Sequence, residues 1–427
     1  MFHQLRFIAC VILTLAICTA LSAQVTITAT CSPTEGWMAD GWGGYKFIIK
    51  NTGKSDVKLT KWTACWEANG KTVGDSWGGD LDLTVPSNDE VTKDEVGYLP
   101  PDIVKKAKPG NPFIVGSFTA VIDGKTVELP YRVEVPEATL PEPTKLLKGK
   151  YIGLEIMQSR LAVFKEQDRL VQCLDHCYEA MHELTGYSPY NGAFITIKEA
   201  PAHPWYAYAG NPIIMNTKHM ENTLKEVDNG VLPFGWIHEV GHDFDDVYGK
   251  WYMWDGPSCE WQANWKLTYA YETIPDRDYL AKWSKNKNAG YQPASKDVLV
   301  DAKQFIDSFF LFFGDPYLSD PTRKWDTMSS DEIHSFFLRL VRVYGWEPFK
   351  AWYRTYARFE KLGLKEPETP EGKIQLIAAI LSEETGVDLV PVFQRWRMPV
   401  TEQDVQAMKA KYPIGNSTNE AEAAKQE

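Results

Sequence analysis

The stretch "GWIHEVGHDF" places two histidines four residues apart, with a glutamate directly after the first. On an α-helix, residues four apart lie about 40° from each other around the axis, one turn along. His238 and His242 could therefore aim both imidazoles at one metal ion, while Glu239 would reach the same side near the open coordination position. These residue types at this spacing are typical of a zinc site that activates water for hydrolysis.

Two histidines do not complete such a site, because a catalytic zinc needs a third protein ligand. A histidine-rich scheme would need a histidine at position 248, where the chain has Tyr248. Asp243, Asp245 and Asp246 follow His242 so closely on the same helix that none could reach the ion without strain. The third ligand is therefore expected from another element.

Glu260 is the best candidate for that ligand. A loop rich in aromatic residues, "YGKWYMWDGPSC", separates it from the first helix, and "CEWQANWKLTYAYE" is typical of a second helix that could lie antiparallel to the first. Asn264 lies one turn beyond Glu260 and would face the same way, as a hydrogen-bonding group behind a ligand. The sequence thus predicts one Zn²⁺ per chain, bound by His238, His242 and Glu260.

Further motifs extend the pattern beyond the zinc site. "YAYAGNPIIM" at residues 206–215 precedes the zinc helix, and "FFLRLVRVYGWEPFKAWYRTY" and "TGVDLVPVFQRWRMPVT" follow it. Together with "HEVGHDFD" and "SCEWQANW", these stretches resemble the gluzincin metallopeptidases of the enhancin and mucinase type (peptidase family M60) over about residues 145–405. Two departures, Asn211 in place of a frequent aromatic residue and Cys259 beside the ligand, leave the substrate preference open.

The resemblance implies that His238, His242 and Glu260 bind zinc and that Glu239 is the catalytic base. It also implies protein or glycoprotein substrates, among them mucin-type proteins that carry O-glycans. Zinc lowers the pKa of its bound water to about 7, and Glu239 would take the proton of that water and return it to the leaving amine. The expected activity is that of a zinc endopeptidase.

The remaining site predictions concern the substrate and the oxyanion. Gly210–Met215 is predicted as a strand that pairs with an extended substrate by β-augmentation, and its first residues are Gly210, Asn211, Pro212 and Ile213. A hydrogen-bond donor near the zinc would stabilise the oxyanion that forms during hydrolysis. The candidates for this donor are Tyr248, Tyr252, Tyr269, His219 and His334.

Two different patterns divide the 427-residue chain. Residues 24–137 alternate short β-rich runs with turn signals such as Asn69-Gly70 and Asp123-Gly124, which predicts an accessory β-sandwich. Its five tryptophans are interpreted mainly as core residues, and glycan binding by exposed ones is the alternative. The proline-rich stretch within residues 138–148 is predicted as a linker.

Residues 149–412 are predicted to form a mainly α-helical (α+β) gluzincin metallopeptidase domain. Helical periodicity covers "KEQDRLVQCLDHCYEAMHELTG", "SSDEIHSFFLRLVRVYG" and "TPEGKIQLIAAILSEETG", and the second of these opens with a capping box from Ser329 to Glu332. "GAFITI" and "NPIIMN" indicate strands, and the polar tail at residues 413–427 is predicted as disordered. The fold class is therefore multidomain, with a β-sandwich before the metallopeptidase domain.

The N-terminus predicts export. One cation precedes an apolar run that ends in small residues, which is the layout of a signal peptide at residues 1–23, and a membrane anchor is the alternative. We therefore expect a secreted, periplasmic or cell-surface protein. In such a compartment Cys31 and Cys65 are expected to form a disulfide, whereas Cys173 and Cys177 are expected to be core thiols.

Composition limits the classes of partner. With 44% hydrophobic and 24% charged residues, the chain is an ordinary globular protein. Its net charge of −12 gives it no electrostatic reason to bind nucleic acid or anionic lipid. We expect a monomer that binds a protein substrate and has no membrane contact after cleavage of the signal.

Two other classes of protein fit parts of this pattern. One is a secreted glycan-binding protein whose peptidase fold is inactive, although the intact set of ligands argues against it. The other is a zinc amidase that acts on cell-wall peptides. A comparison of mucin, casein and peptidoglycan fragments as substrates would separate these classes.

Overall fold

The computed structural model describes residues 25–32, 37–39, 41–201, 203–245, 248–254, 257–276, 278–283, 298–308 and 310–415. The predicted signal peptide, residues 1–23, and residues 416–427 of the predicted tail lie outside the described residues. Contacts divide the chain into two compact units. The first comprises the chain up to Glu142 with Glu199–Tyr206 and Asn216–His219, and the second comprises the remainder.

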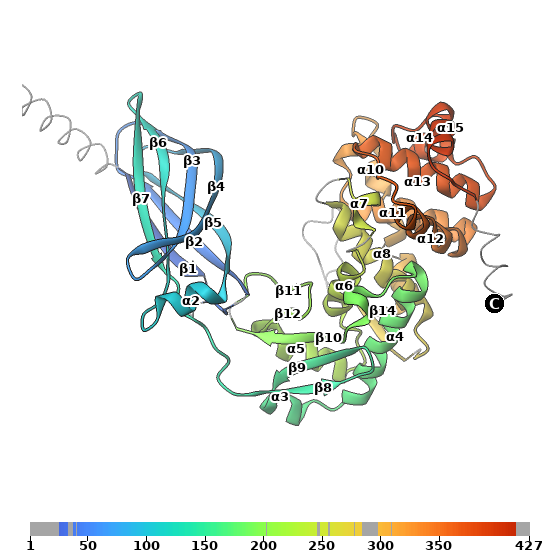
Figure 1. Ribbon diagram of the computed structural model, residues 1–427, viewed down its shortest axis with the longest axis horizontal. Coiled ribbons are helices and arrows are strands. Elements are labelled where there is room, and N and C mark those ends of the chain that lie inside the picture. Colours follow the sequence, from blue (N-terminus) through green and yellow to red (C-terminus); the bar gives the residue numbers. More distant parts are fainter. Residues whose placement is uncertain are drawn as a thin grey trace, which may run out of the picture. The chain divides into compact units, whose positions relative to one another are not determined.

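Two antiparallel sheets form most of the first unit (Figure 1). The three-stranded sheet has the order β1-β2-β5, with β1 (Val25–Ser32), β2 (Gly41–Asn51) and β5 (Asp89–Leu99). The four-stranded sheet has the order β4-β3-β6-β7, with β4 (Lys71–Val85), β3 (Val57–Ala68), β6 (Phe113–Ile122) and β7 (Lys125–Glu134); α2 (Pro101–Ala107) follows β5. Apolar side chains from both sheets share one core, which is the packing of a β-sandwich.

Two of the predicted turns close hairpins in this unit. Asn69 and Gly70 join β3 to β4, and Asp123 and Gly124 join β6 to β7. All four residues have positive φ, as a type I′ turn requires at both central positions. The hairpin prediction is confirmed at these two places, because Asn, Asp and Gly adopt this backbone conformation more readily than other residues.

Tryptophans account for much of the core of the first unit. Three of the five that the sequence places here are at most 9% exposed: Trp37, Trp62 and Trp66. The indole nitrogen of Trp37 donates to the carbonyl of Gly44, so the buried polar atom has a partner. For these three residues the core interpretation is confirmed.

The expected disulfide between Cys31 and Cys65 is wrong, because Cys65 is a free thiol. Cys31 lies on β1 of the three-stranded sheet, whereas Cys65 lies on β3 of the other sheet and donates its thiol to the carbonyl of Val115. The sequence places both cysteines in the N-terminal region, but it does not show which sheet each of them joins. Cys173 and Cys177 are buried free thiols, as expected.

A five-stranded sheet, in the order β11-β12-β10-β9-β8, opens the part of the chain that follows the β-sandwich. Its strands are β8 (Thr144–Lys148), β9 (Ile152–Met157), β10 (Ile195–Ala200), β11 (Ala207–Tyr208) and β12 (Ile213–Asn216). β8 lies within the segment predicted as a linker and pairs antiparallel with β9. The linker prediction was too long because the prolines end at Pro143, and the residues after it are free to join a sheet.

Helices make up most of the remaining chain. They are α3 (Gln158–Val163), α4 (Gln167–Thr185), α5 (Thr217–Asp228), α6 (Phe234–Asp243), α7 (Gly249–Tyr252), α8 (Pro257–Thr273), α9 (Ala302–Ser308), α10 (Asp315–Ser319), α11 (Ser330–Tyr344), α12 (Glu347–Lys361), α13 (Pro370–Thr385), α14 (Val390–Arg395) and α15 (Glu402–Lys411). Three short 3₁₀ turns lie at Pro189–Gly192, Phe310–Phe312 and Trp325–Thr327, and β13 (Leu280–Trp283) pairs with β14 (Val298–Asp301). Across the described residues, no helix combines the length and the apolar character that crossing a bilayer requires.

The helix ends follow the local signals in the sequence. Ser329 and Glu332 form the predicted capping box at the start of α11. α4 and α13 end at Gly186 and Gly386, which both adopt the left-handed conformation. These ends are confirmed because a cap depends only on residues within a few positions of it.

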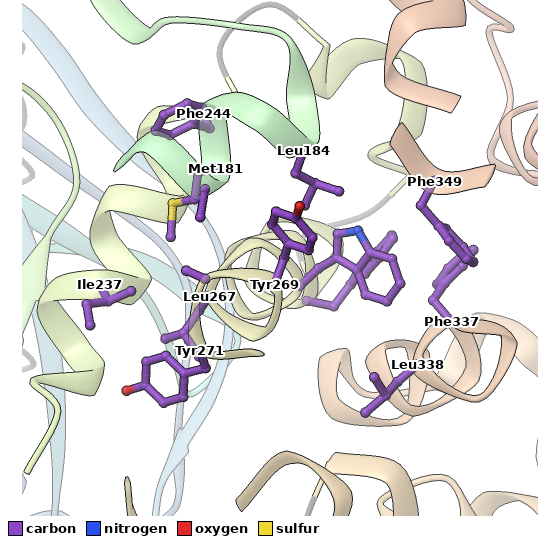
Figure 2. Close-up of a cluster of buried hydrophobic side chains, with 14 of the residues drawn as sticks. Met181, Leu184, Ile237, Phe244, Leu267, Tyr269, Tyr271, Phe337, Leu338 and Phe349 are labelled. Carbon is purple, nitrogen blue, oxygen red and sulfur yellow. The ribbon is translucent and has the colours of Figure 1, made fainter. Parts of the chain in front are cut away.

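Helix α8 is the centre of the helical part. Every residue from Trp261 to Tyr271 is buried, so this helix has no solvent-facing side over that length. Figure 2 shows its side chains among those of neighbouring helices, with the following residues labelled: Met181, Leu184, Ile237, Phe244, Leu267, Tyr269, Tyr271, Phe337, Leu338 and Phe349. Polar side chains on this stretch must therefore find partners inside the protein.

His334 is such a partner and is itself fully buried. It lies on α11, where its Nε2 is 3.0 Å from Oγ1 of Thr268 on α8. Its Nδ1 has no hydrogen-bond partner among the described residues. Burial, with a smaller contribution from Arg342, lowers the pKa of His334 to about 3, so this imidazole is neutral in the folded protein at neutral pH.

We expect His334 to make the protein less stable in acid. The unfolded chain binds a proton at this residue near pH 6.5, whereas the folded chain does so only near pH 3. The free energy of unfolding should therefore fall by about 1.4 kcal/mol per pH unit as the pH drops through that window. Urea unfolding from pH 7 to 4 should show this slope diminished in His334→Gln and kept in His182→Gln, which alters an exposed histidine. An unchanged slope in His334→Gln would contradict the assignment.

Candidate metal centre

Helix α6 carries the two histidines on one face and apolar residues on the other. Trp236, Ile237 and Val240 are fully buried, whereas His238 and His242 are only partly buried. The helix packs against α8 through Gly241, where an added Cβ would lie 2.7 Å from the carbonyl oxygen of Ala263. Glycine at this position lets the two helix backbones approach closely, which brings α8 within reach of the histidines.

Three side chains converge between these helices. Nε2 of His238 lies 3.1 Å from Nε2 of His242 and 3.2 Å from Oε2 of Glu260. Nε2 of His242 lies 3.7 Å from Oε1 of Glu260, and one ligand atom from each residue falls within 4.8 Å of the others. The structure thus brings together the three residues that the sequence proposed, from two different helices.

This donor set fits a zinc ion. Two imidazole nitrogens and one carboxylate oxygen are the protein ligands of many catalytic zinc sites, which leave a further position open for water. The two imidazole planes lie at 88° to each other, so their Nε2 atoms approach one point from different directions. Glu260 is exposed at this point, so the site is open to solvent.

The charges of the site are arranged for a cation. Hydrogen bonds with His238 and His242 hold the pKa of the Glu260 carboxyl well below its usual range. Burial lowers the pKa of His242, but Asp245 and Glu260 outweigh that effect and raise the pKa to about 9. A divalent cation bound between these donors would take the place of the proton on His242.

Each imidazole also has a side-chain oxygen behind its Nδ1. Nδ1 of His238 lies 2.9 Å from Oδ1 of Asn264, one turn beyond Glu260 on α8. Nδ1 of His242 faces Oδ2 of Asp245 at 3.7 Å, which is longer than a direct hydrogen bond. A carbonyl or carboxylate behind Nδ1 favours the tautomer that leaves Nε2 free for a metal.

Asn264 offers a direct test of this arrangement. We expect Asn264→Ala to weaken zinc binding about 10- to 100-fold, because His238 loses the acceptor that fixes its ring and its tautomer. Asn264→Asp keeps an acceptor at the same place and should retain most of the affinity. Competition with a chelator of known affinity measures both variants. Equal binding by Asn264→Ala and the wild type would exclude this role.

Glu239 lies on the side of α6 that faces β11. Its carboxylate accepts a hydrogen bond from the backbone N–H of Ala209. Burial raises its pKa above the ordinary glutamate value, although the neighbouring His238 and His242 oppose the shift. A raised pKa brings a carboxylate closer to the range in which it can both accept and return a proton near neutral pH.

Asp243, one turn after Glu239 on α6, binds the backbone of Gly210, the residue that follows Ala209. Its Oδ1 accepts the backbone N–H of Gly210 at 2.8 Å and the hydroxyl of Tyr190 at 2.9 Å. Asp243 is almost fully buried, and burial raises its pKa to about 8. Two acidic side chains one turn apart on α6, Glu239 and Asp243, thus fix the backbone of residues 209 and 210 beside the site.

The predicted substrate strand is placed differently from the prediction. Only Ile213 of the four named residues lies in β12, while Gly210, Asn211 and Pro212 form the connection from β11. β12 lies between β11 and β10, so its hydrogen-bonding edges are used within the sheet. β11 is the strand at this edge, and the predicted strand over residues 210–215 is corrected to Ile213–Asn216, an inner strand, because sequence does not show which strand ends a sheet. Substrate binding by residues 210–213 stays a prediction.

The predicted oxyanion donors have partners of their own. The hydroxyl of Tyr252 donates to Oδ1 of Asp245 at 2.5 Å. Tyr248 is buried and its ring lies near that of Tyr353, and Tyr269 is buried with its ring near that of Trp346. His219 packs against Tyr206, and His334 is bound to Thr268 inside the core. The structure singles out none of these five side chains as the donor.

Sequence reasoning missed Asp243 and Asp245 as supporting residues and considered them only as alternative ligands. It also gave no role to Lys266, whose ammonium group is fully buried against Asp245. The available signal was a lysine within a stretch of aromatic and apolar residues, which requires an internal partner once that helix is buried.

The chain matches the family model of peptidase M60, enhancin and enhancin-like, over residues 122–397. The chain belongs to this family. The matched region includes the whole of α6 and α8, and with them all three converging side chains. As an M60 protein, the chain contains a peptidase domain of this family.

The M60 chain is also similar to curated and solved proteins. It is 23% identical to TRPM8 channel-associated factor 2 of Homo sapiens over 346 residues, which are 79% of this chain and 32% of that protein. The chain thus spans about a third of the length of the curated relatives it matches. A functionally unknown conserved protein from Bacillus anthracis str. Ames has 16% identity and a TM-score of 0.47, with 89% of this chain and 73% of that chain covered. A metallopeptidase from Bacteroides thetaiotaomicron has 12% identity and a TM-score of 0.42, with 89% and 66% covered.

Proposed function

We propose that this M60 protein is a secreted zinc endopeptidase that hydrolyses peptide bonds in mucin-type O-glycosylated proteins. The observation that carries the proposal is the convergence of His238, His242 and Glu260 beside the half-buried carboxylate of Glu239. A metal held by this donor set needs no further protein ligand, and the exposed side of Glu260 leaves room for a substrate.

The chain's own residues divide the chemistry between them. A zinc ion at this site would supply Lewis acidity, which acidifies a water molecule and polarises the scissile carbonyl. Glu239 takes a proton from the attacking water and returns it to the leaving amine. The hydrogen bond from Ala209 orients the Glu239 carboxylate, and Asp243 holds the adjoining Gly210 in place.

The proposed class of substrate rests on the motifs and on the N-terminal sequence. The motifs of this chain resemble those of M60 enzymes that act on mucin-type proteins, and the N-terminal sequence is typical of an exported protein. As an association at the level of the fold, the β-sandwich is proposed to bind glycan or protein.

Digestion of a defined substrate panel tests the proposal. The purified protein, its zinc content known, is incubated with an O-glycosylated mucin peptide set, casein and peptidoglycan peptides, and mass spectrometry locates the cuts. We expect cleavage of the mucin peptides that a chelator abolishes and zinc restores. Cleavage of the peptidoglycan peptides alone would indicate an amidase. Zinc binding without any cleavage would indicate a glycan-binding protein with an inactive peptidase fold.

A further inference from the structure

A buried ion pair lies directly behind the metal centre. Lys266 is fully buried on α8, and its ammonium group donates to Oδ1 of Asp245 and to the carbonyl of Gln262 at 3.2 Å. Asp245 is only 7% exposed, and its Oδ1 also accepts the hydroxyl of Tyr252. Neither charge has access to bulk water, so each depends on the other.

Stability alone does not account for this pair. Taking two charges out of water costs more than their attraction commonly returns, and apolar residues of similar volume often stabilise a core as well or better. The stretch around Lys266 consists mainly of aromatic and small apolar residues, which could fill this space without any charge. The Lys266–Asp245 pair is therefore better explained by a functional role than by folding stability.

The position of Asp245 supplies that reason. Its Oδ1 accepts hydrogen bonds from Lys266 and Tyr252. Within the part of the chain that the structure describes, its Oδ2 accepts no hydrogen bond, and it faces Nδ1 of His242 at 3.7 Å. The opposite nitrogen of the same ring, Nε2, points to His238 and Glu260. Lys266 therefore fixes a carboxylate whose second oxygen faces the metal-binding histidine.

We propose that Lys266 is a positioning residue of the metal centre, acting on His242 through Asp245. This inference rests on the proposed zinc site. α8 then supports the site in three ways: Glu260 is a ligand, Asn264 holds His238, and Lys266 holds Asp245 against His242. Because all three lie on one rigid helix, its placement against α6 sets the ligand and both ring orientations together.

Zinc affinity and folding stability separate this role from a structural one. Lys266→Met leaves Asp245 as an unpaired buried charge, so it is expected to lose stability as well as affinity. The double variant Lys266→Met/Asp245→Leu removes both charges and should fold at least as well as a chain with one charge left alone. Tyr353→Phe is the matched control, because it removes a hydrogen bond from Gln262 on the same helix without touching Asp245.

We expect the double variant to bind zinc about 10- to 100-fold more weakly than the wild type in chelator competition, although it is folded. Lys266→Met should bind at least as weakly, and Tyr353→Phe should bind within about twofold of the wild type. Thermal unfolding of the metal-free proteins reports stability separately. A double variant that binds zinc like the wild type would overturn the proposal, since a purely structural pair can be replaced without any effect on the metal.

This outcome is distinguishable from failure of the proposed function. If the wild type and all variants bind zinc equally and cleavage by the wild type is lost in Glu239→Gln, the enzyme assignment stands and the role of Lys266 falls. If the wild type itself binds no zinc, both fall.

Discussion

Glu239→Gln should keep its zinc and lose peptide hydrolysis by about 10²- to 10⁴-fold. The amide has the same shape as the carboxylate but cannot accept the proton of the attacking water. Glu239 is not among the three converging donors, so metal binding should be unaffected. Steady-state cleavage of a fluorogenic peptide, together with zinc analysis of the same preparation, measures both properties.

Glu371→Gln is a suitable control for this substitution. Glu371 is exposed in the first turn of α13, so the same chemical change there should leave cleavage and zinc content unaltered. Undiminished cleavage by Glu239→Gln would show that another group is the base. Loss of zinc from Glu239→Gln would show instead that this glutamate is a ligand.

Glu260→Gln should lose both zinc and activity. Its carboxylate is the anionic member of the donor set, and the neutral amide binds zinc poorly, which leaves two imidazoles. Loss of a residue that only hydrogen-bonds to a ligand can weaken zinc binding by up to about 100-fold. Because Glu260 is itself a ligand, we expect a larger loss of zinc affinity. Chelator competition measures the affinity, and addition of excess zinc tests whether cleavage returns.

The contrast between Glu260→Gln and Glu239→Gln decides between their roles. Glu260 is proposed as a ligand and Glu239 as the base, so only the substitution of Glu260 should change the zinc affinity. If Glu260→Gln retains zinc with wild-type affinity, the third ligand is another group and the donor set is incomplete as described.

Local features of the fold followed from the sequence wherever a few neighbouring residues decide the structure. The capping box at Ser329, the glycine that ends α4 and the Asn69-Gly70 hairpin depend on backbone conformations that those residues favour. The spacing of His238 and His242 belongs to the same class, because one helical turn brings residues four apart to the same face.

Other features depended on which elements pack together. The residues after Pro143 form β8 because β9 offers a strand to pair with, and β12 became an inner strand because β11 covers its edge. Cys65 is a free thiol that donates to the carbonyl of Val115 on the neighbouring strand β6. None of these outcomes is encoded within a window of neighbouring residues.

The metal centre shows both kinds of information in one place. The sequence by itself determined the pair of histidines, the glutamate between them and a second helix that carries Glu260, since each is a matter of residue type and helical period. Only the tertiary structure decided that α8 would be buried on all sides from Trp261 to Tyr271. As a result Lys266 contacts Asp245, and Asp245 faces His242. Burial removes water as a partner for these charges, and which partner replaces water is fixed by the packing of helices that lie apart in the chain.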